Sequence, residues 1–302
     1  MVQTLFQQIR SNNFKSFLLV VVFFIFVGIL GSFFGLYMGN LYFGIGLSVI
    51  FAIIYSLIMF NSGDSMILKM TGAKPVTKKE YPHLYHSVEG LALAAGVPPP
   101  KAYVIKDSAM NAFATGKDPK HASIVVTTGL MDVMNRQELE GVIAHEMSHI
   151  KNYDIRIMML AVVLVGVVTL ISDFMLHSFL WGGHRRSNNN EGGGGFQVVM
   201  IVVGLVLAIL APIVAYMIKM GISRQREYLA DASAVQLTRY PEGLANALAK
   251  ISKDPDPLVD DANKATAHLF ISTPFRKKKG FMTGLFATHP PIKERIKRLK
   301  GM

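Results

Sequence analysis

The 302-residue chain contains no cysteine and few charged residues. Without cysteine it can form no disulfide, and any metal it binds must be held by nitrogen and oxygen ligands. Charged residues make up 17% of the sequence against 51% hydrophobic residues, a balance too apolar for an ordinary soluble enzyme of this length. Acidic residues are the scarcer sign, 20 against 31 basic, so the formal net charge is +11. The composition therefore indicates membrane-embedded segments.

The apolar residues are concentrated in four runs that are nearly free of charge. Each run is about 20 residues long, enough to cross a bilayer as a helix. They are Phe17–Tyr37, Leu41–Phe60, Ile157–Leu176 and Phe196–Ile218. A buried core helix is the alternative for Ile157–Leu176, but its length and its uniform Val, Leu and Ile content favour a membrane span. We therefore expect four transmembrane helices.

Basic residues near the ends of these runs predict the orientation, because cytoplasmic loops are enriched in lysine and arginine. Those on one side are Arg10, Lys15, Lys69, Lys74, Lys78, Lys79, Lys151, Arg156, Lys219, Arg224 and Arg226. Only Arg185 and Arg186 fall on the other side. The pattern predicts a multi-pass protein of the cell membrane with both termini in the cytoplasm. Its positive charge would face anionic lipid headgroups, and no nucleic-acid motif or stacking aromatic suggests a nucleic-acid partner.

The runs divide the chain into two membrane hairpins and two parts of one polar domain. The hairpins are residues 1–60 and 157–218, and the polar parts are residues 61–156 and 219–302. The sequence thus predicts a domain interrupted by a membrane hairpin.

Local patterns in the polar parts predict mostly helix with a small β-sheet. Glu80–Ala95 has helical spacing and ends before a glycine and three prolines. Ala102–Ile105 and Ala122–Thr128 are β-branched and apolar, as strands are. Ile292–Leu299 predicts a basic amphipathic helix near the end of the chain.

The most informative motif is His145-Glu146-Met147-Ser148-His149. On a helix, residues four apart share one face, so both imidazoles can reach one metal ion. Glu146 is poorly placed to be a third ligand and can instead deprotonate an attacking water. Asn135 and Glu138 form a predicted capping box ahead of the motif, which places the motif inside a helix. A surface helix with scattered histidines is the alternative reading.

A catalytic zinc site needs a third protein ligand from elsewhere in the chain. Glu227 is the best candidate, and Asp231 lies four residues further on the same helical face. Asp231 could orient a ligand imidazole through its other ring nitrogen. The alternative is a surface helix whose acidic residues form solvated ion pairs with Arg224 and Arg226. We expect one Zn2+ per chain, held by His145, His149 and Glu227.

Two further elements could contribute to substrate binding. The small-residue stretch Asn111-Ala112-Phe113-Ala114 could form an exposed sheet edge onto which an extended peptide adds as a strand. A loop or an internal strand is an equally good reading of the pattern. His289 precedes two prolines and could donate a hydrogen bond to the oxyanion, although most lone histidines are not catalytic.

With these motifs in this order, the chain resembles the HtpX family of membrane-bound zinc metallopeptidases, which are related to the CAAX prenyl proteases. The resemblance extends over essentially the whole chain, including the four apolar runs. It implies a gluzincin-like fold, zinc ligation by His145, His149 and Glu227, and Glu146 as catalytic base. It also implies stress-related quality control of damaged membrane proteins, and it favours Asn111–Gly116 as the strand that binds substrate.

The predicted activity is therefore zinc-dependent hydrolysis of peptide bonds in membrane-associated or misfolded proteins at the cytoplasmic face. Two alternatives remain. A prenyl-protein endoprotease of the CAAX type would share every catalytic residue, although four spans argue against it. A non-catalytic membrane scaffold could keep zinc for structure, but structural sites usually take four protein ligands, often cysteines. The sequence does not indicate the oligomeric state.

Overall fold

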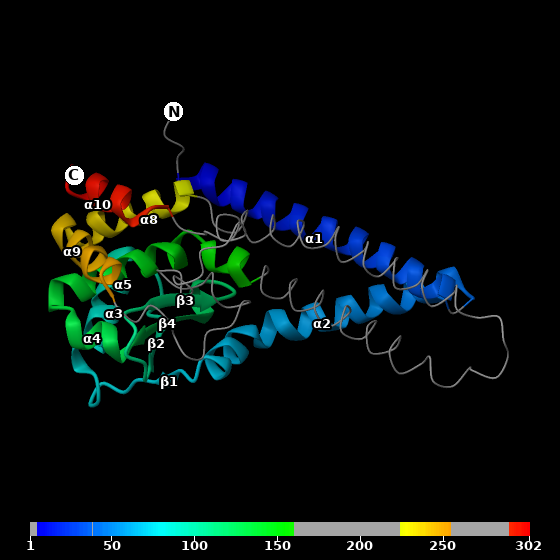
Figure 1. The fold of residues 1–302 in the computed structure, drawn as a ribbon, viewed down its shortest axis with the longest axis horizontal. Helices are drawn as coiled ribbons and strands as arrows, with labels where there is room; N and C mark the ends of the chain where they lie inside the picture. Colours follow the sequence, from blue (N-terminus) through cyan, green and yellow to red (C-terminus); the bar gives the residue numbers. More distant parts are fainter. Residues whose placement is uncertain (1–4, 38, 160–223, 255–289) are drawn as a thin grey trace.

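Two long helices form a hairpin that projects from the rest of the molecule (Figure 1). The computed structural model describes residues 5–37, 39–159, 224–254 and 290–302. Helix α1 spans Leu5–Tyr37 and helix α2 spans Leu41–Met70. Asn40 caps α2 by accepting a hydrogen bond from the Phe43 amide at 3.1 Å. The connection between the helices is therefore short and fixed by local bonds.

Glycines let the two helices of the hairpin approach closely. A Cβ added at Gly31 would lie 2.7 Å from the Gly44 carbonyl oxygen, and one at Gly35 would lie 2.7 Å from the Asn40 carbonyl oxygen. Such contacts are shorter than real side chains tolerate, so larger residues would force the helices apart. Small residues at a helix interface are typical of membrane helix pairs.

Of the described helices, α2 is the one that is long and apolar enough to cross a membrane. Within α1, Phe23–Ser32 is apolar but shorter. The predicted fourth run, and the third run beyond Met159, lie outside the described residues. The first residues of that third run do not face a membrane, since Ile157, Met158 and Met159 are buried against protein.

Helix α2 continues past Phe60 to Met70 and packs against strand β3 of the sheet described below. Ile67 and Leu68 form a buried cluster with Phe113 of the sheet and with Met158 and Met159. The sequence pattern ends the predicted span at Phe60 because Asn61 begins a more polar stretch. Hydrophobic burial against the sheet, rather than lipid, accounts for the extra turns of helix.

The described sheet has four strands in the order β1-β2-β4-β3. Their bounds are Lys74–Pro75 for β1, Lys101–Ile105 for β2, Ala112–Gly116 for β3 and Ala122–Thr127 for β4. Strands β2 and β4 pair in parallel, with Ala102 opposite Ile124, while the outer strands pair antiparallel. The sheet is therefore mixed, and β3 lies at one edge of it.

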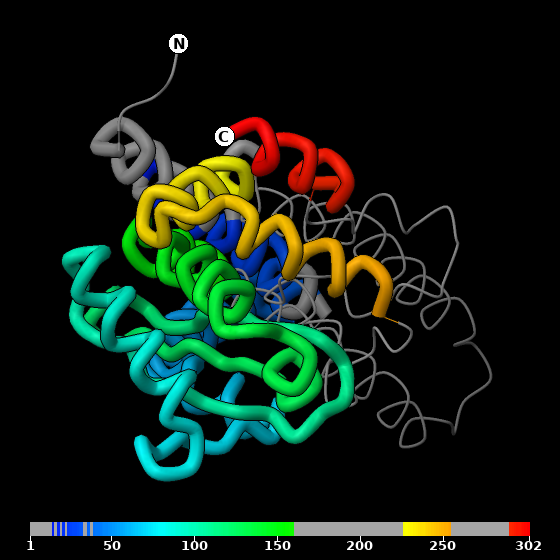
Figure 2. The backbone as a smooth tube through the Cα atoms, turned by 90° about the vertical axis from the view of Figure 1, so that its left-hand side faces the viewer, coloured from blue at the N-terminus to red at the C-terminus, as the bar shows by residue number. Residues whose placement is uncertain are grey.

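Helix α5, Arg136–Lys151, lies between the sheet and helices α8 (Arg224–Thr238) and α9 (Pro241–Ser252) (Figure 2). The other described helices of the polar part are α3 (Pro82–Ala95), α4 (Thr128–Val133) and α10 (Ile292–Leu299), with a short 3-10 turn at Pro119–His121. The predicted mostly helical fold with a small sheet is confirmed. Thr128 begins α4 instead of ending a strand, because the Thr127 side chain caps the helix by accepting from the Leu130 amide.

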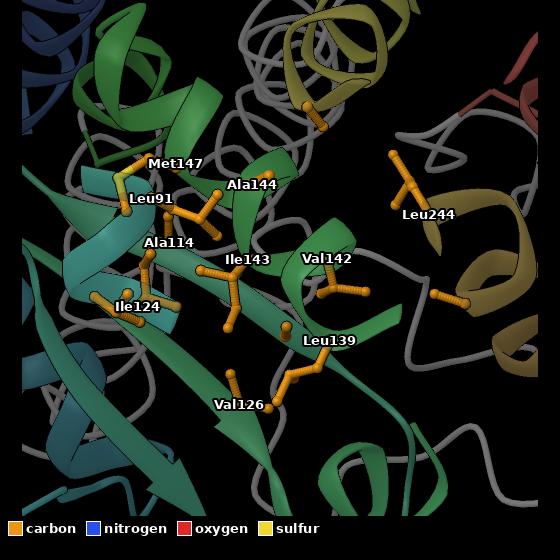
Figure 3. Close-up of a cluster of buried hydrophobic side chains, with 14 of the residues drawn as sticks. Leu91, Ala114, Ile124, Val126, Leu139, Val142, Ile143, Ala144, Met147 and Leu244 are labelled. Atoms are coloured by element: carbon orange, nitrogen blue, oxygen red, sulfur yellow. The ribbon is translucent and has the colours of Figure 1, made fainter. Parts of the chain in front are cut away.

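Side chains of α5 form the centre of the hydrophobic core (Figure 3). Ile143 and Met147 are fully buried and face Ile124 and Ala114 of the sheet, while Val142 faces Leu244 of α9. Burial of each such side chain contributes roughly 1.5–3 kcal/mol relative to exposure. The helix that carries the histidine motif is thus held on both sides by packing.

Candidate metal centre

Helix α5 begins with the predicted capping box. The Asn135 side chain accepts from the Glu138 amide at 2.9 Å, and the Glu138 carboxylate accepts from the Asn135 amide at 2.9 Å. Lys250 of α9 lies 2.6 Å from the same Glu138 carboxylate. The capping box satisfies two amides at the start of the helix, and the Lys250 ion pair connects this first turn to α9.

The histidine motif lies in the last turns of α5 and is buried. His145, Glu146 and His149 are 1%, 3% and 4% exposed. The four-residue spacing places both rings on one face, and their Nε2 atoms lie 3.3 Å apart. Two imidazole nitrogens so close together, away from solvent, indicate a site that can share one cation.

Helix α8 brings Glu227 to the same point. One carboxylate oxygen of Glu227 lies 3.6 Å from His145 Nε2, and the other lies 3.5 Å from His149 Nε2. Within the described residues, this trio is the group of three that could hold a metal ion, with all ligand atoms within 4.8 Å of one another. The structure thus brings together residues that are far apart in the sequence.

The spacing of these atoms fits a zinc ion. Ligand atoms at tetrahedral corners about 2.0–2.1 Å from zinc would lie roughly 3.3–3.4 Å from one another. The two Nε2 atoms are 3.3 Å apart, and the Glu227 oxygen nearest to each of them lies at 3.6 and 3.5 Å, close to that value. Nitrogen and oxygen donors also suit zinc, and three protein ligands leave the fourth position open.

The second nitrogen of the His145 ring is held by Asp231, four residues after Glu227 on α8. Asp231 Oδ1 lies 3.0 Å from His145 Nδ1. A hydrogen on Nδ1 that is donated to this carboxylate would direct the lone pair of Nε2 at a metal. Asp231 was predicted to act in this way, and its geometry is consistent with that role.

Arg295 of α10 also binds the Asp231 carboxylate. This residue was not predicted from the sequence. Its Nε and Nη2 atoms donate to the two Asp231 oxygens at 2.9 and 2.7 Å. Nη1 lies 3.4 Å from Glu227, and the side chain is fully buried. A signal was available, because Arg295 interrupts the apolar face that Ile292, Ile296 and Leu299 form at helical spacing.

The second nitrogen of the His149 ring is held by Asp154, another residue that the sequence did not reveal. Asp154 Oδ2 lies 3.1 Å from His149 Nδ1, and Asp154 Oδ1 lies 3.3 Å from Arg226 Nη1. The imidazoles of His145 and His149 therefore each have a carboxylate on Nδ1, and each carboxylate contacts a buried arginine.

These contacts raise the histidine pKa values in the metal-free site. For His145, burial and the Arg295 charge oppose protonation, but hydrogen bonds to Asp231 and Glu227 outweigh them and raise its pKa to about 9. The pKa of His149 is raised as well, against burial, by its hydrogen bond to Asp154 and the Glu227 charge. The pKa of Asp231 is lowered because Arg295 and His145 favour the carboxylate over the opposing effect of burial. Protons therefore compete with a metal for this site.

The other predicted residues are placed as follows. Ala112, Phe113 and Ala114 lie in β3, the edge strand, with Asn111 just before it. All four side chains are buried, and β3 pairs with β4 rather than with Ala102–Ile105. His289 lies outside the described residues.

The fold has a counterpart among solved structures. The crystal structure of Ste24p from S. mikatae superposes with a TM-score of 0.51 at 20% identity, covering 93% of this chain and 62% of that one. The likeness shows the fold, and on this fold the two buried imidazoles of α5 and the Glu227 carboxylate of α8 form a candidate metal centre.

The sequence relatives specify the family. The profile described as "Peptidase family M48" matches residues 78–302. Proteins named "Protease HtpX homolog" are 45% identical in Dictyoglomus thermophilum and 47% identical in Caldanaerobacter subterraneus subsp. tengcongensis, covering 99% of this chain and 95% and 98% of the relatives. One from Streptococcus pyogenes serotype M28 is 47% identical, covering 99% of this chain and 100% of the relative.

The chain belongs to peptidase family M48. It is a membrane metalloprotease, and the family implies a metal at its active site.

Proposed function

We propose that this chain is an integral-membrane endopeptidase that uses one Zn2+ to hydrolyse membrane-associated or misfolded polypeptides at the cytoplasmic face. The observation that carries the proposal is the convergence of His145 Nε2, His149 Nε2 and the Glu227 carboxylate within 3.3–3.6 Å of one another. Three buried nitrogen and oxygen donors that converge in this way, with a fourth position left for water, are the ligand set of a catalytic zinc ion.

The residues around the ligands supply the rest of the chemistry. Zinc, when bound, would polarise the scissile carbonyl and make the attacking water more acidic. Glu146, which follows His145 on α5, would accept the water proton and deliver it to the leaving amine. Asp231 would hold the His145 ring in a fixed orientation, with Nε2 directed at the metal.

Strand β3 supports the proposed mode of substrate binding. It is an edge strand of the described sheet, next to α5, so an extended peptide could add to its outer edge through main-chain hydrogen bonds. Buried side chains would hold the strand in place through packing. These are Asn111, Ala112, Phe113 and Ala114. Such binding depends little on substrate side chains and suits the removal of diverse damaged proteins. His289 remains a candidate donor to the oxyanion.

The membrane location supports this class of substrate. Helix α2 is apolar enough to cross a bilayer and continues directly into the cluster beneath β3, so the site is held near the membrane surface. We further propose a multi-pass topology with both termini in the cytoplasm, based on the distribution of basic residues.

Similarity over nearly the whole chain to proteins named as HtpX proteases favours this function over the alternatives. The likeness to Ste24p is one of fold and covers 62% of that chain, so it does not favour a prenyl-protein substrate. A scaffold with structural zinc is disfavoured because the family consists of peptidases.

The test uses full-length protein purified in detergent. Glu146→Gln should bind zinc as the parent does but should cleave casein roughly 10²–10⁴-fold more slowly, because the general base is lost. Glu140→Gln is the matched control, since Glu140 lies on the same helix and its partner is Arg136 at 2.8 Å. Undiminished cleavage by Glu146→Gln, or cleavage by the parent that survives complete removal of zinc, would refute the proposal.

A further inference from the structure

The two ligand histidines are oriented by carboxylates from different parts of the chain. Asp231 lies on α8, the helix that carries Glu227. Asp154 instead follows α5, the helix that carries His149, and its second oxygen pairs with Arg226. Arg226 is adjacent in sequence to Glu227. The Asp154–Arg226 pair therefore links the end of one ligand helix to the start of the other.

A turn in the backbone after α5 brings Asp154 back toward His149. Helix α5 ends at Lys151, and Tyr153 adopts a left-handed conformation with φ 60°. A tyrosine rarely adopts this conformation, so surrounding contacts must hold it. The Arg156 guanidinium lies 4.9 Å above the Tyr153 ring and donates to the Lys117 carbonyl at 3.1 Å. Without the turn, α5 would continue and carry Asp154 away from His149.

The charges of this pair are removed from water. Asp154 is 1% exposed and Arg226 is 9% exposed. A buried carboxylate and a buried guanidinium are tolerated when each satisfies the other, and their relative position is then tightly constrained. Burial lowers the pKa of Arg226, while the Asp154 charge and hydrogen bond act in the opposite direction and support its charged form.

The same carboxylate also acts on the metal ligand. Asp154 Oδ2 lies 3.1 Å from His149 Nδ1 and can accept the hydrogen of that nitrogen. The lone pair of His149 Nε2 then faces Glu227 and His145. One oxygen of Asp154 thus fixes the ring orientation, and the other fixes the approach of α8.

We propose that Asp154 and Arg226 are positioning residues that set the geometry of the metal site across the two ligand helices. The proposal rests on the proposed function, since it takes His149 and Glu227 as zinc ligands. Asp154 fixes the tautomer and orientation of His149, and Arg226 fixes the distance of its neighbour Glu227 from α5. Neither residue touches the metal or the substrate.

The experiment measures zinc affinity and thermal stability of the full-length protein in detergent. The variants are Asp154→Asn, Arg226→Met and the double variant, with zinc affinity measured by competition with a chromogenic chelator. Loss of a residue that orients a metal-binding histidine typically weakens metal binding about 10–100-fold. We expect that loss for Asp154→Asn and a smaller loss for Arg226→Met. The double variant should lose less than the product of the two, because both act through one contact.

Lys250→Met is the matched control. Lys250 pairs with buried Glu138 at 2.6 Å, so this change breaks an ion pair at the opposite end of α5. It should lower the melting temperature with and without zinc, and leave the zinc affinity within about twofold, because it does not touch a ligand. The two positioning variants also break a buried ion pair and should lose melting temperature without zinc as well, but in them alone the increment in melting temperature produced by zinc should shrink.

Arg226→Lys is a second, milder test should Asp154→Asn fail to fold. It keeps the charge but not the fork geometry, so its zinc affinity should lie between those of the parent and Arg226→Met. Zinc affinities equal to the parent's in all folded variants would overturn the inference while leaving the proposed function intact. Failure of the parent itself to bind zinc would overturn both.

Discussion

At the scale of single residues, the protonation of His145 links the metal site to pH. Its pKa is raised from 6.5 to about 9 in the metal-free protein, where Asp231 and Glu227 outweigh the opposing effects of burial and Arg295. A folded-state pKa above the unfolded value means that the proton stabilises the metal-free fold. This stabilisation is fully present below pH 6.5 and is lost as the pH rises through about 9.

The stabilisation that zinc provides should depend on pH in the opposite direction, because zinc binds the neutral imidazole and must displace the proton. We expect the melting temperature of the zinc-free protein to fall between pH 6.5 and about 9, while the increment produced by zinc grows over the same range. Thermal melting with chelator and with excess zinc at each pH measures both quantities. A zinc increment that shrinks as the pH rises would contradict the protonation scheme.

Arg295 is the residue whose loss should damage stability most. Its guanidinium makes two bonds to Asp231 and is fully buried, so Arg295→Met would leave buried carboxylates without their cation. Removing one partner of a buried ion pair typically costs about 3–5 kcal/mol. Chemical denaturation of the zinc-free protein measures this loss.

Arg298 provides the control for Arg295 on the same helix. It pairs with Glu294 at 2.9 Å and lies over the Tyr228 ring, but half of its side chain is exposed. Exposed pairs contribute little, so Arg298→Met should change stability by about 1 kcal/mol or less. Equal losses of stability in Arg295→Met and Arg298→Met would mean that burial of Arg295 does not increase its contribution to stability.

At the scale of elements, the contact between α5 and α9 sets the position of the histidine motif. A Cβ added at Gly141 would lie 2.7 Å from the Leu244 backbone nitrogen, so the two helix backbones touch there. Gly141→Ala would force them apart, and overpacking of this kind typically costs about 1–3 kcal/mol. We expect lower stability and lower peptidase activity, measured by thermal melting and casein cleavage.

Gly90 of α3 tests whether the effect comes from the contact or from the substitution. A Cβ at Gly90 would meet nothing within 4 Å. Gly90→Ala should therefore stabilise the protein by about 0.5–1 kcal/mol, because alanine favours helix over glycine. If Gly141→Ala stabilised the protein to the same degree, this result would contradict the close contact between the backbones of α5 and α9 at Gly141.

Local sequence signals predicted the elements well where a short pattern was decisive. The capping box of Asn135 and Glu138 is present, and the amphipathic helix Ile292–Leu299 has the predicted bounds. The turn at Tyr153 and the extension of α2 to Met70 were missed, because both depend on contacts with distant segments. Periodicity reports local preference and does not record such contacts.

The residues of the candidate site also divide into those that a local pattern predicts and those that depend on contacts between distant segments. His145 and His149 were predicted from spacing within one helix, and Glu227 from the chemistry of a three-ligand site. Asp154, Arg226 and Arg295 were not found, because their roles arise from packing between α5, α8 and α10. An arginine on an otherwise apolar helix face was the one local signal that could have revealed Arg295.

At the scale of the whole molecule, the predicted topology can be mapped with introduced cysteines, since the chain has none of its own. Tyr42 lies at the start of α2 and is exposed, and Lys79 follows α2 and is exposed. In intact cells, Tyr42→Cys should react with a membrane-impermeant maleimide and Lys79→Cys should not. Permeabilised cells serve as the control, in which both should react. Labelling of Lys79→Cys in intact cells would reverse the proposed orientation.

The most direct test of the metal centre is an anomalous difference map at the zinc edge from crystals of the full-length protein. We predict one zinc ion per chain, bonded to His145 Nε2, His149 Nε2 and a Glu227 oxygen at about 2.0–2.2 Å. A zinc ion bound elsewhere, or a Glu227 carboxylate turned away from the ion, would contradict the proposed centre.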